Sequence, residues 1–133
     1  MELREKLDQV DYYFWTLHDL REQLTDLTGR RFDLVLCLEV AEHLPKHQAH
    51  NALIATLVKS TGNNLIFSAA QPGQEGTGHI NLQPFSYWIE TIERWSYIKL
   101  NGQKTADTRK AFERFLPDGF RFLANNLLVF SRI

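Results

Sequence analysis

Polar side chains that could take part in chemistry cluster in three segments of the chain. These segments are His18–Leu20, Leu38–His43 and Ser68–Asn81, and each one ends or follows a stretch that is predicted to be a strand. In open α/β sheets, ligands bind in the crevice beyond the carboxyl ends of the strands. The sequence therefore predicts one site to which all three segments contribute.

Three closely spaced histidines raise the question of a metal site. His43, His47 and His50 follow one another, and Glu42 directly precedes the first of them. A zinc site would need a pattern such as H-E-x-x-H with a third ligand, and Pro45 interrupts the helical face between the first two histidines. We therefore interpret these residues as the solvated start of a helix and expect no metal.

His79 stands at the end of a loop that contains Gly73, Gly76 and Gly78. A neutral imidazole there could act as a general base or orient a substrate hydroxyl or amine. The alternative is that His79 and Asn81 only connect the loop to the next helix through capping hydrogen bonds. The glycine spacing matches neither a dinucleotide fingerprint nor a P-loop, which leaves a flexible turn or a mobile lid.

Strands and helices alternate along the chain. Segments 10–17, 32–38, 65–70, 96–100 and 127–130 are predicted strands, and segments 46–60, 85–95 and 103–116 are predicted helices. The almost wholly apolar strand Phe32–Leu38 is typical of a strand that is buried on both faces. This order predicts a single α/β domain over residues 1–133, with a mostly parallel sheet flanked by helices and an antiparallel member possible among the last strands.

The composition is that of a folded protein without a strong charge bias. The chain has 133 residues, of which 44% are hydrophobic, and a net charge of −1. Its Lys and Arg residues are scattered, so we expect no nucleic-acid partner. No apolar run approaches the roughly 20 residues that a membrane span needs, so we expect a cytoplasmic protein. The only cysteine, Cys37, lies in an apolar run and is predicted to be a buried hydrophobic residue.

One segment resembles a known family motif. The run from Phe32 to Pro45, FDLVLCLEVAEHLP, is similar to the fourth-strand motif of class I S-adenosylmethionine (SAM)-dependent methyltransferases. Segment 64–70 resembles the fifth strand of that family, and segments 71–88 and 125–130 resemble one of its subgroups. The resemblance covers about residues 10–133. It implies a partial Rossmann-like fold, SAM as the cofactor and a small-molecule methyl acceptor as the substrate.

The resemblance also implies which residues bind the cofactor. Asp19 and Leu20 correspond to the segment that lies against the adenine. Cys37, Leu38 and Glu39 correspond to the strand end whose backbone faces the methionine part of SAM. These five residues are therefore the predicted cofactor-binding set.

Four further residues are implied on the substrate side. Glu42 and His43 match the pair that borders both cofactor and substrate in the family. His79 and Asn81 would lie beside the substrate, and His79 is the candidate for catalytic acid–base chemistry.

Two parts of the family's cofactor site have no counterpart in the sequence. These are the first strand with its G-x-G-x-G turn and the second strand with its acidic residue, and no glycine precedes Gly29. The resemblance thus implies a truncated methyltransferase-like domain. In that family the first strand lies beside the fourth, so we expect an open apolar edge at Phe32–Leu38.

An open edge of this kind invites pairing with another strand. We expect either Val10–Leu17 or a partner chain to fill it, and we predict a homodimer or a poorly soluble monomer. The alternative to an enzyme is a non-catalytic interaction or regulatory subunit, derived from a methyltransferase, that completes a partner chain.

Overall fold

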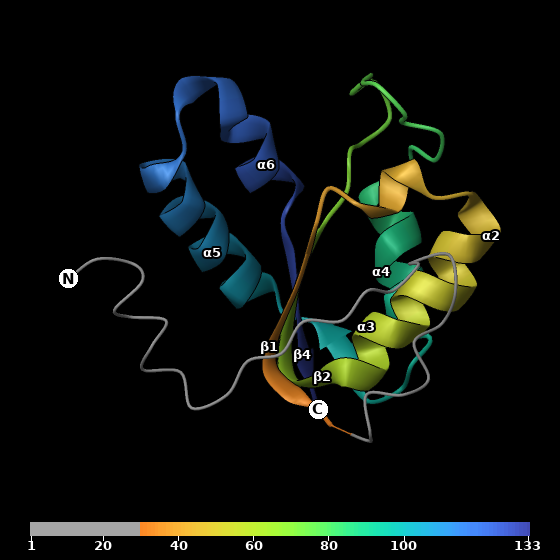
Figure 1. Cartoon of the computed structure of the whole chain (residues 1–133). Coiled ribbons are helices and arrows are strands. Elements are labelled where there is room, and N and C mark those ends of the chain that lie inside the picture. Colours follow the sequence, from red (N-terminus) through yellow and green to blue (C-terminus); the bar gives the residue numbers. More distant parts are fainter. Residues whose placement is uncertain (1–29) are drawn as a thin grey trace.

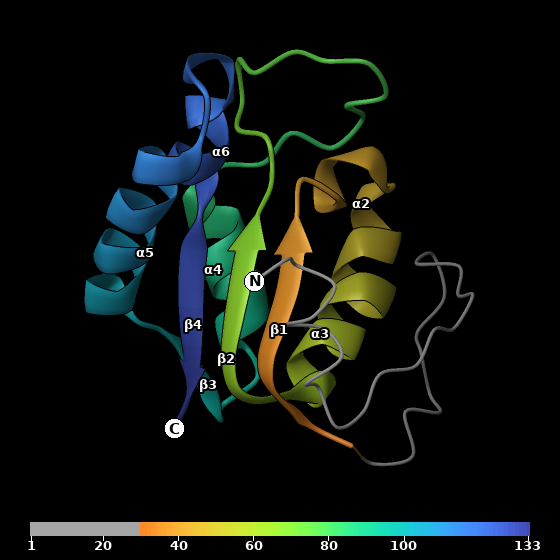
Figure 2. The ribbon, with the colours of Figure 1, turned by 60° about the vertical axis from the view of Figure 1, so that its left-hand side comes forward.

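The described part of the chain is a four-stranded sheet between two layers of helices. A computed structural model describes residues 30–133, so Asp19, Leu20 and the strand predicted at 10–17 lie outside the described residues. Helices α2, α3 and α4 cover one face of the sheet, and α5 and α6 lie on the other (Figure 1, Figure 2). The elements are β1 (Phe32–Leu38), a 3₁₀ turn (Ala41–His43), α2 (Lys46–Gln48), a π-helical turn (Ala49–Leu53), α3 (Ile54–Ser60), β2 (Thr61–Ser68), α4 (Phe85–Glu93), β3 (Ile98–Leu100), α5 (Gly102–Phe115), a 3₁₀ turn (Asp118–Phe120), α6 (Arg121–Asn126) and β4 (Leu128–Arg132).

β1 and β2 are parallel neighbours that are joined by a helix. Cys37 pairs with Phe67 and Leu38 with Ser68, so both strands end at the same edge of the sheet. The connection runs from 46 to 60 through α2, the π-helical turn and α3, which is the range predicted from the apolar spacing. It begins after Pro45, where the missing N–H of proline removes no helical hydrogen bond. The predicted strand–helix–strand unit is confirmed.

The sheet is mixed, which corrects the expectation of a mostly parallel sheet. Its order is β1–β2–β4–β3, and β4 runs antiparallel to both β2 and β3. The antiparallel direction of β4 follows from the direction in which α5 runs beside it. The Thr105 hydroxyl accepts a hydrogen bond from the Val129 N–H, and Arg109, one turn later, donates to the Leu127 carbonyl. Because α5 carries the chain toward the edge where β2 ends, β4 must run back in the opposite direction.

The main core lies between the sheet and helices α3 and α4. The Trp88 side chain of α4 is fully buried, and its ring centroid lies 5.3 Å from that of Phe67 on β2. Full burial of a large apolar side chain stabilises the fold by about 1.5–3 kcal/mol, so this layer holds β1 and β2 firmly in place. The other large apolar residues that are almost completely buried are Leu53, Ile54, Leu65, Ile92, Ile98, Leu127 and Phe130.

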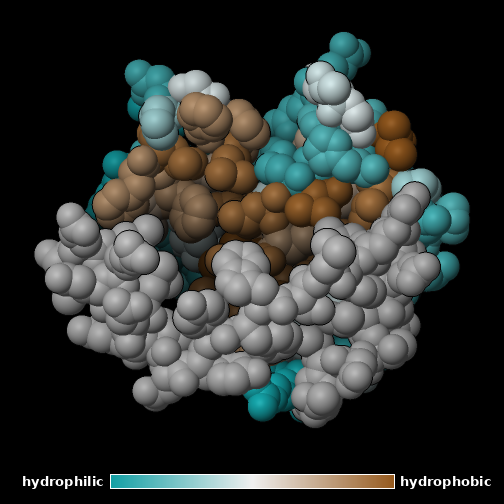
Figure 3. Space-filling model, in the orientation of Figure 1, coloured by the Kyte–Doolittle hydropathy of each residue, from teal (hydrophilic) through white to brown (hydrophobic). Residues whose placement is uncertain are grey.

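Among the residues that the structure describes, β1 is covered on one face only, contrary to the prediction that both faces are buried. Cys37 is buried and Val35 packs against the core, whereas Leu34 and Leu36, which alternate with them, are 52% and 55% exposed. β1 is also an edge strand of the described sheet. Figure 3 shows hydrophobic residues gathered on this side of the molecule, between the α5–α6 layer and the β1 end of the sheet.

The C-terminal third differs from the prediction in two further respects. Helix α6 is not predicted by the sequence pattern, because six residues are too few to show a helical period. The apolar residues of the predicted helix 103–116 have the spacing of one helical side, and Phe115, one of them, is 85% exposed. Among residues 30–133, no helix combines the length and the hydrophobicity that crossing a bilayer requires.

Candidate functional site

The segments that follow β1 and β2 meet at one edge of the sheet. The Glu39 N–H donates to the carbonyl of Ser68 at 3.0 Å, which joins the two strand ends. The carbonyl of Glu42 then accepts hydrogen bonds from the N–H groups of Ile80 and Asn81, at 2.9 and 3.0 Å. The predicted convergence of these two segments on one site is therefore confirmed for the described residues.

A pocket of about 460 Å³ lies at this edge, within the roughly 300–1,000 Å³ that is usual for small-molecule sites. Three of its lining residues are acidic, two are histidines, and one aromatic ring comes from α6. The lining residues are Glu39, Glu42, His43, Ala70, Gln74, Glu75, His79 and Phe122. Four residues predicted from the sequence, Glu39, Glu42, His43 and His79, are thus brought together.

Glu42 is a buried acid whose carboxylate has no hydrogen-bond partner. The residue is 0% exposed, and neither carboxylate oxygen accepts a hydrogen bond of normal geometry from the described residues. Burial raises the pKa of the Glu42 carboxyl, and the nearby charge of Glu39 raises it further, while the backbone of Glu42 and Ala70 acts in the opposite direction. Burial and the charge of Glu39 therefore favour the protonated acid, and a cation or a hydrogen-bond donor in the pocket would satisfy its buried oxygens.

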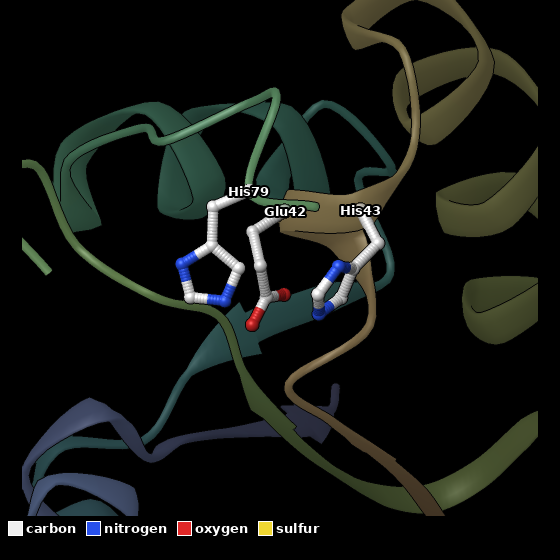
Figure 4. Close-up of side chains that lie close together, drawn as sticks. All are labelled: Glu42, His43 and His79. Atoms are coloured by element: carbon white, nitrogen blue, oxygen red, sulfur yellow. The ribbon is translucent and has the colours of Figure 1, made fainter. Parts of the chain in front are cut away.

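His43 and His79 lie beside this carboxylate, which is seen between them in the view of Figure 4. Their ring centroids are 4.9 Å apart in an edge-to-face arrangement. His43 Nδ1 is 3.0 Å from the carbonyl oxygen of Gly78, and His79 Nδ1 is 2.9 Å from that of Gln74. Because a carbonyl only accepts, each Nδ1 must carry the proton, and Nε2 of each neutral ring is left with a free lone pair.

The glycine loop is built around these two imidazoles. A Cβ on Gly76 would come within 2.6 Å of the His79 ring, and a Cβ on Gly78 would come within 3.2 Å of His43 Nδ1. Gly78 also has a φ of 76°, which side-chain-bearing residues rarely adopt. These glycines therefore allow the loop backbone to approach both rings closely. Neither predicted role of the loop, a flexible turn or a mobile lid, includes this positioning of the two histidines.

Asn126 anchors the other side of the pocket, and it was not among the site residues predicted from the sequence. Its buried amide donates to Glu39 Oε1 at 3.2 Å and to Gln74 Oε1 at 2.8 Å. Glu39 itself has a φ of 53°, which turns the chain sharply after β1. Asn126 lies at the end of α6, far from both partners in the sequence, so no local spacing reveals the contact. The same holds for Phe122, which lines the pocket from α6.

Three predicted site residues do not line the pocket. The Cys37 side chain is buried, and burial together with the charge of Glu42 raises the pKa of its thiol to about 12. Leu38 ends β1 without lining the pocket. Asn81 is buried behind the site, where its amide donates to the Ala41 carbonyl at 3.4 Å, so its contacts are those of the linking role.

Comparisons with known proteins add no assignment to this geometry. No family model, no curated protein and no solved structure matches the chain. What the site can bind must therefore be argued from its own residues.

Proposed function

We propose that the chain is a methyltransferase-like domain that binds SAM and a small methyl acceptor in the pocket at the ends of β1 and β2. The observation that carries the proposal is the convergence of the segments after Leu38 and Ala70 on one pocket. The resemblance of the motif FDLVLCLEVAEHLP to the methyltransferase family supports the assignment, because Glu39, directly after its strand, and its Glu42–His43 pair line that pocket. The fold, an α/β sheet flanked by helices, is of the general class that the proposal requires.

The charge of the pocket fits this cofactor. SAM carries a positive sulfonium, and the pocket is lined by Glu39, Glu42 and Glu75, with no Lys or Arg among the lining residues. Opposite charges attract strongly in a partly enclosed site, where water screens them less than in bulk solution. Glu39 and the backbone at the end of β1 would hold the methionine part, and the exposed ring of Phe122 offers an apolar wall. When bound, SAM supplies an electrophilic methyl group.

His79 would serve the acceptor rather than the cofactor. Its Nδ1 proton is engaged by the Gln74 carbonyl, so Nε2 is free to accept a proton from an acceptor hydroxyl or amine. Glu42, whose hydrogen-bonding capacity is unused, would orient the acceptor by accepting a hydrogen bond. Both residues would thus position the acceptor for in-line attack.

Calorimetric titration of the full chain with SAM and with its demethylated product, in the presence of a chelator, tests the proposal. We expect saturable one-to-one binding that is weakened at least tenfold in Glu39→Gln. Glu90→Gln, an exposed acid on α4, is the control and should bind as the unaltered chain does. Absence of saturable heat with both compounds would refute the cofactor assignment.

The role of His79 is tested separately with radiolabelled SAM and a panel of small phenols, amines and carboxylic acids. We expect His79→Ala to retain SAM affinity within about twofold and to lose methyl transfer, because it removes a proton acceptor worth roughly 10²–10⁴-fold in rate. Transfer at an unchanged rate would exclude His79 as the base.

A second candidate function is a non-catalytic interaction subunit, and it rests on a different observation. Leu34 and Leu36 expose an apolar face on an edge strand of the described sheet. Exposed apolar edges favour strand pairing and face-to-face packing with another chain. Light scattering over a concentration series tests this candidate, which predicts a concentration-dependent dimer, whereas a monomer at all concentrations counts against self-association.

A further inference from the structure

Three side chains of the pocket offer metal-ligating atoms at one point. Glu42, His43 and His79 each supply one ligand atom, and these atoms all lie within 4.8 Å of one another. The Glu42 carboxylate lies between the two imidazole rings in the close-up (Figure 4). The expectation of no metal rested on the spacing of His43, His47 and His50, whereas here the second imidazole comes from the glycine loop.

The histidines are already held in the form that binds metal. Each Nδ1 faces a backbone carbonyl, of Gly78 for His43 and of Gln74 for His79, at 3.0 and 2.9 Å. Histidine ligands in proteins almost always donate the second ring N–H to such a carbonyl or to a carboxylate, which fixes the tautomer and makes the other nitrogen a better ligand. Both Nε2 atoms are therefore prepared as donors.

The burial of Glu42 is a second observation, independent of the spacing of the three side chains, that indicates a ligand in this pocket. Its carboxylate is completely buried and unpartnered among the described residues, and it faces the pocket that both histidines line. The carboxylate of Glu39 lies close enough to repel it. A cation between the Glu42 oxygens and the two imidazoles would remove this repulsion and satisfy the buried oxygens together.

We propose that Glu42, His43 and His79 bind one divalent transition-metal ion of the zinc type. Ligands at about 2.0–2.1 Å from such an ion lie about 3.4 Å apart, so the most distant pair, now within 4.8 Å, must approach by up to about 1.4 Å. His43 is exposed and can rotate toward the ion without disturbing the core. Two imidazoles with one carboxylate suit Zn²⁺, Co²⁺, Ni²⁺ or Fe²⁺, whereas Mg²⁺ prefers oxygen ligands alone. The remaining coordination positions would open into the pocket.

The inference does not rest on the proposed function, because it concerns binding by three side chains. The two proposals nevertheless share Glu42 and His79, which would contact either the acceptor or the metal ion. A metal-bound Nε2 of His79 has no lone pair left for a proton, so the loaded protein would not use His79 as a general base. Titration of metal without SAM, and of SAM with a chelator, lets either proposal fail alone.

The test is a calorimetric titration of the chelator-treated full chain with ZnCl₂, CoCl₂ and MgCl₂. We expect one equivalent of Zn²⁺ or Co²⁺ to bind and to raise the thermal midpoint, because an ion that binds only the folded chain stabilises it. Loss of any one ligand in His43→Ala, His79→Ala or Glu42→Gln should weaken binding at least tenfold. Mg²⁺ should bind at least tenfold more weakly than Zn²⁺.

Two other histidines, His47 and His50, serve as matched controls. His47→Ala and His50→Ala remove imidazoles from the neighbouring helix and should leave the Zn²⁺ titration unchanged. The proposal is overturned if the unaltered chain shows no saturable binding. It is also overturned if the double variant His43→Ala/His79→Ala binds as the unaltered chain does. Since His43 is exposed, the single variant His43→Ala tests the site without a risk to folding.

Discussion

At the scale of single residues, the unpaired carboxylate of Glu42 should limit stability in the absence of metal. Both oxygens are buried without a hydrogen-bond partner among the described residues, and leaving such a group unsatisfied costs about 1–3 kcal/mol or more. Glu42→Gln keeps the shape, removes the charge that Glu39 repels and adds an amide that can donate to the Glu39 carboxylate, so in the presence of a chelator it should raise the thermal midpoint by several degrees. Glu90→Gln is the exposed control, for which calorimetric scanning should give no change. A lower midpoint for Glu42→Gln would mean that the Glu42 carboxylate has favourable partners in the folded protein.

Cys37 gives a prediction about pH at the same scale. Burial, with a contribution from the charge of Glu42, raises the pKa of the thiol to about 12, so the folded state favours the protonated form. This contribution to stability is complete below the ordinary thiol pKa, near 8.5, and is lost as the pH rises toward 12. At pH 8 the thiolate fraction should be roughly 10⁻⁴ in the folded chain and about a quarter in the unfolded one.

The measurement is the rate at which Cys37 reacts with an aromatic disulfide reagent, in buffer and in denaturant. We expect reaction at least 100-fold slower in the folded chain, because both the thiolate fraction and the access to the sulfur fall on folding. Equal rates would show that the thiol is neither buried nor protonated under native conditions. Since Cys37 is the only cysteine, no other thiol can contribute to the signal.

The pocket residues could be predicted from sequence only where a local rule applies. Glu39, Glu42 and His43 follow an apolar strand, and His79 ends a glycine loop, so strand-end chemistry identifies them. Gln74 and Asn126, by contrast, enter through contacts between segments that are 52 residues apart. Such contacts depend on the tertiary fold, and no residue spacing in a single sequence reveals them.

At the scale of elements, the glycine loop positions the histidines through close backbone approach. Alanine at position 76 would place its Cβ 2.6 Å from the His79 ring, a distance that real Cβ atoms do not show, so the ring must move. Gly76→Ala should therefore shift the His79 ring-proton resonances and weaken Zn²⁺ binding at least tenfold. Gly119→Ala is the matched control, because a Cβ there meets no atom within 4 Å. If Gly76→Ala binds Zn²⁺ as tightly as the unaltered chain, the loop does not set the position of His79.

Element prediction succeeded where burial and periodicity coincide. β1 and the helix from 46 to 60 carry strong apolar patterns because they pack in the main core, and their positions agree with those patterns. β2 was predicted at 65–70 and is a strand, but it spans Thr61–Ser68. The direction of β4 could not be predicted, because it follows from the path of α5 rather than from the residues of the strand. Strands with one face covered and strands with both faces covered can carry the same apolar pattern, so the exposed face of β1 could not be predicted from the sequence.

At the scale of the whole molecule, the two faces of the sheet are unequally covered. The face toward α3 and α4 is sealed by the core, whereas on the other face α5 and α6 pack over β4 and leave Leu34 and Leu36 of β1 exposed among the described residues. The metal-ligand cluster lies at the carboxyl edge and draws its residues from the segments after β1 and β2. Binding in the pocket and association through β1 therefore use separate side chains and can be altered separately.

This separation leads to the last prediction, which concerns association of the whole chain. Leu34→Ser/Leu36→Ser removes apolar area from the exposed face of β1, and about 25 cal/mol is lost for each Å² of apolar surface that no longer becomes buried on association. Light scattering should show a concentration-dependent dimer for the unaltered chain and a monomer for the double variant, while the Zn²⁺ titration stays the same. Phe115→Ser, which removes an apolar side chain that is 85% exposed on α5, is the control and should still dimerise. A dimer that persists in the double variant would exclude the β1 face as the interface, because four leucines would then have been lost from the pair without effect.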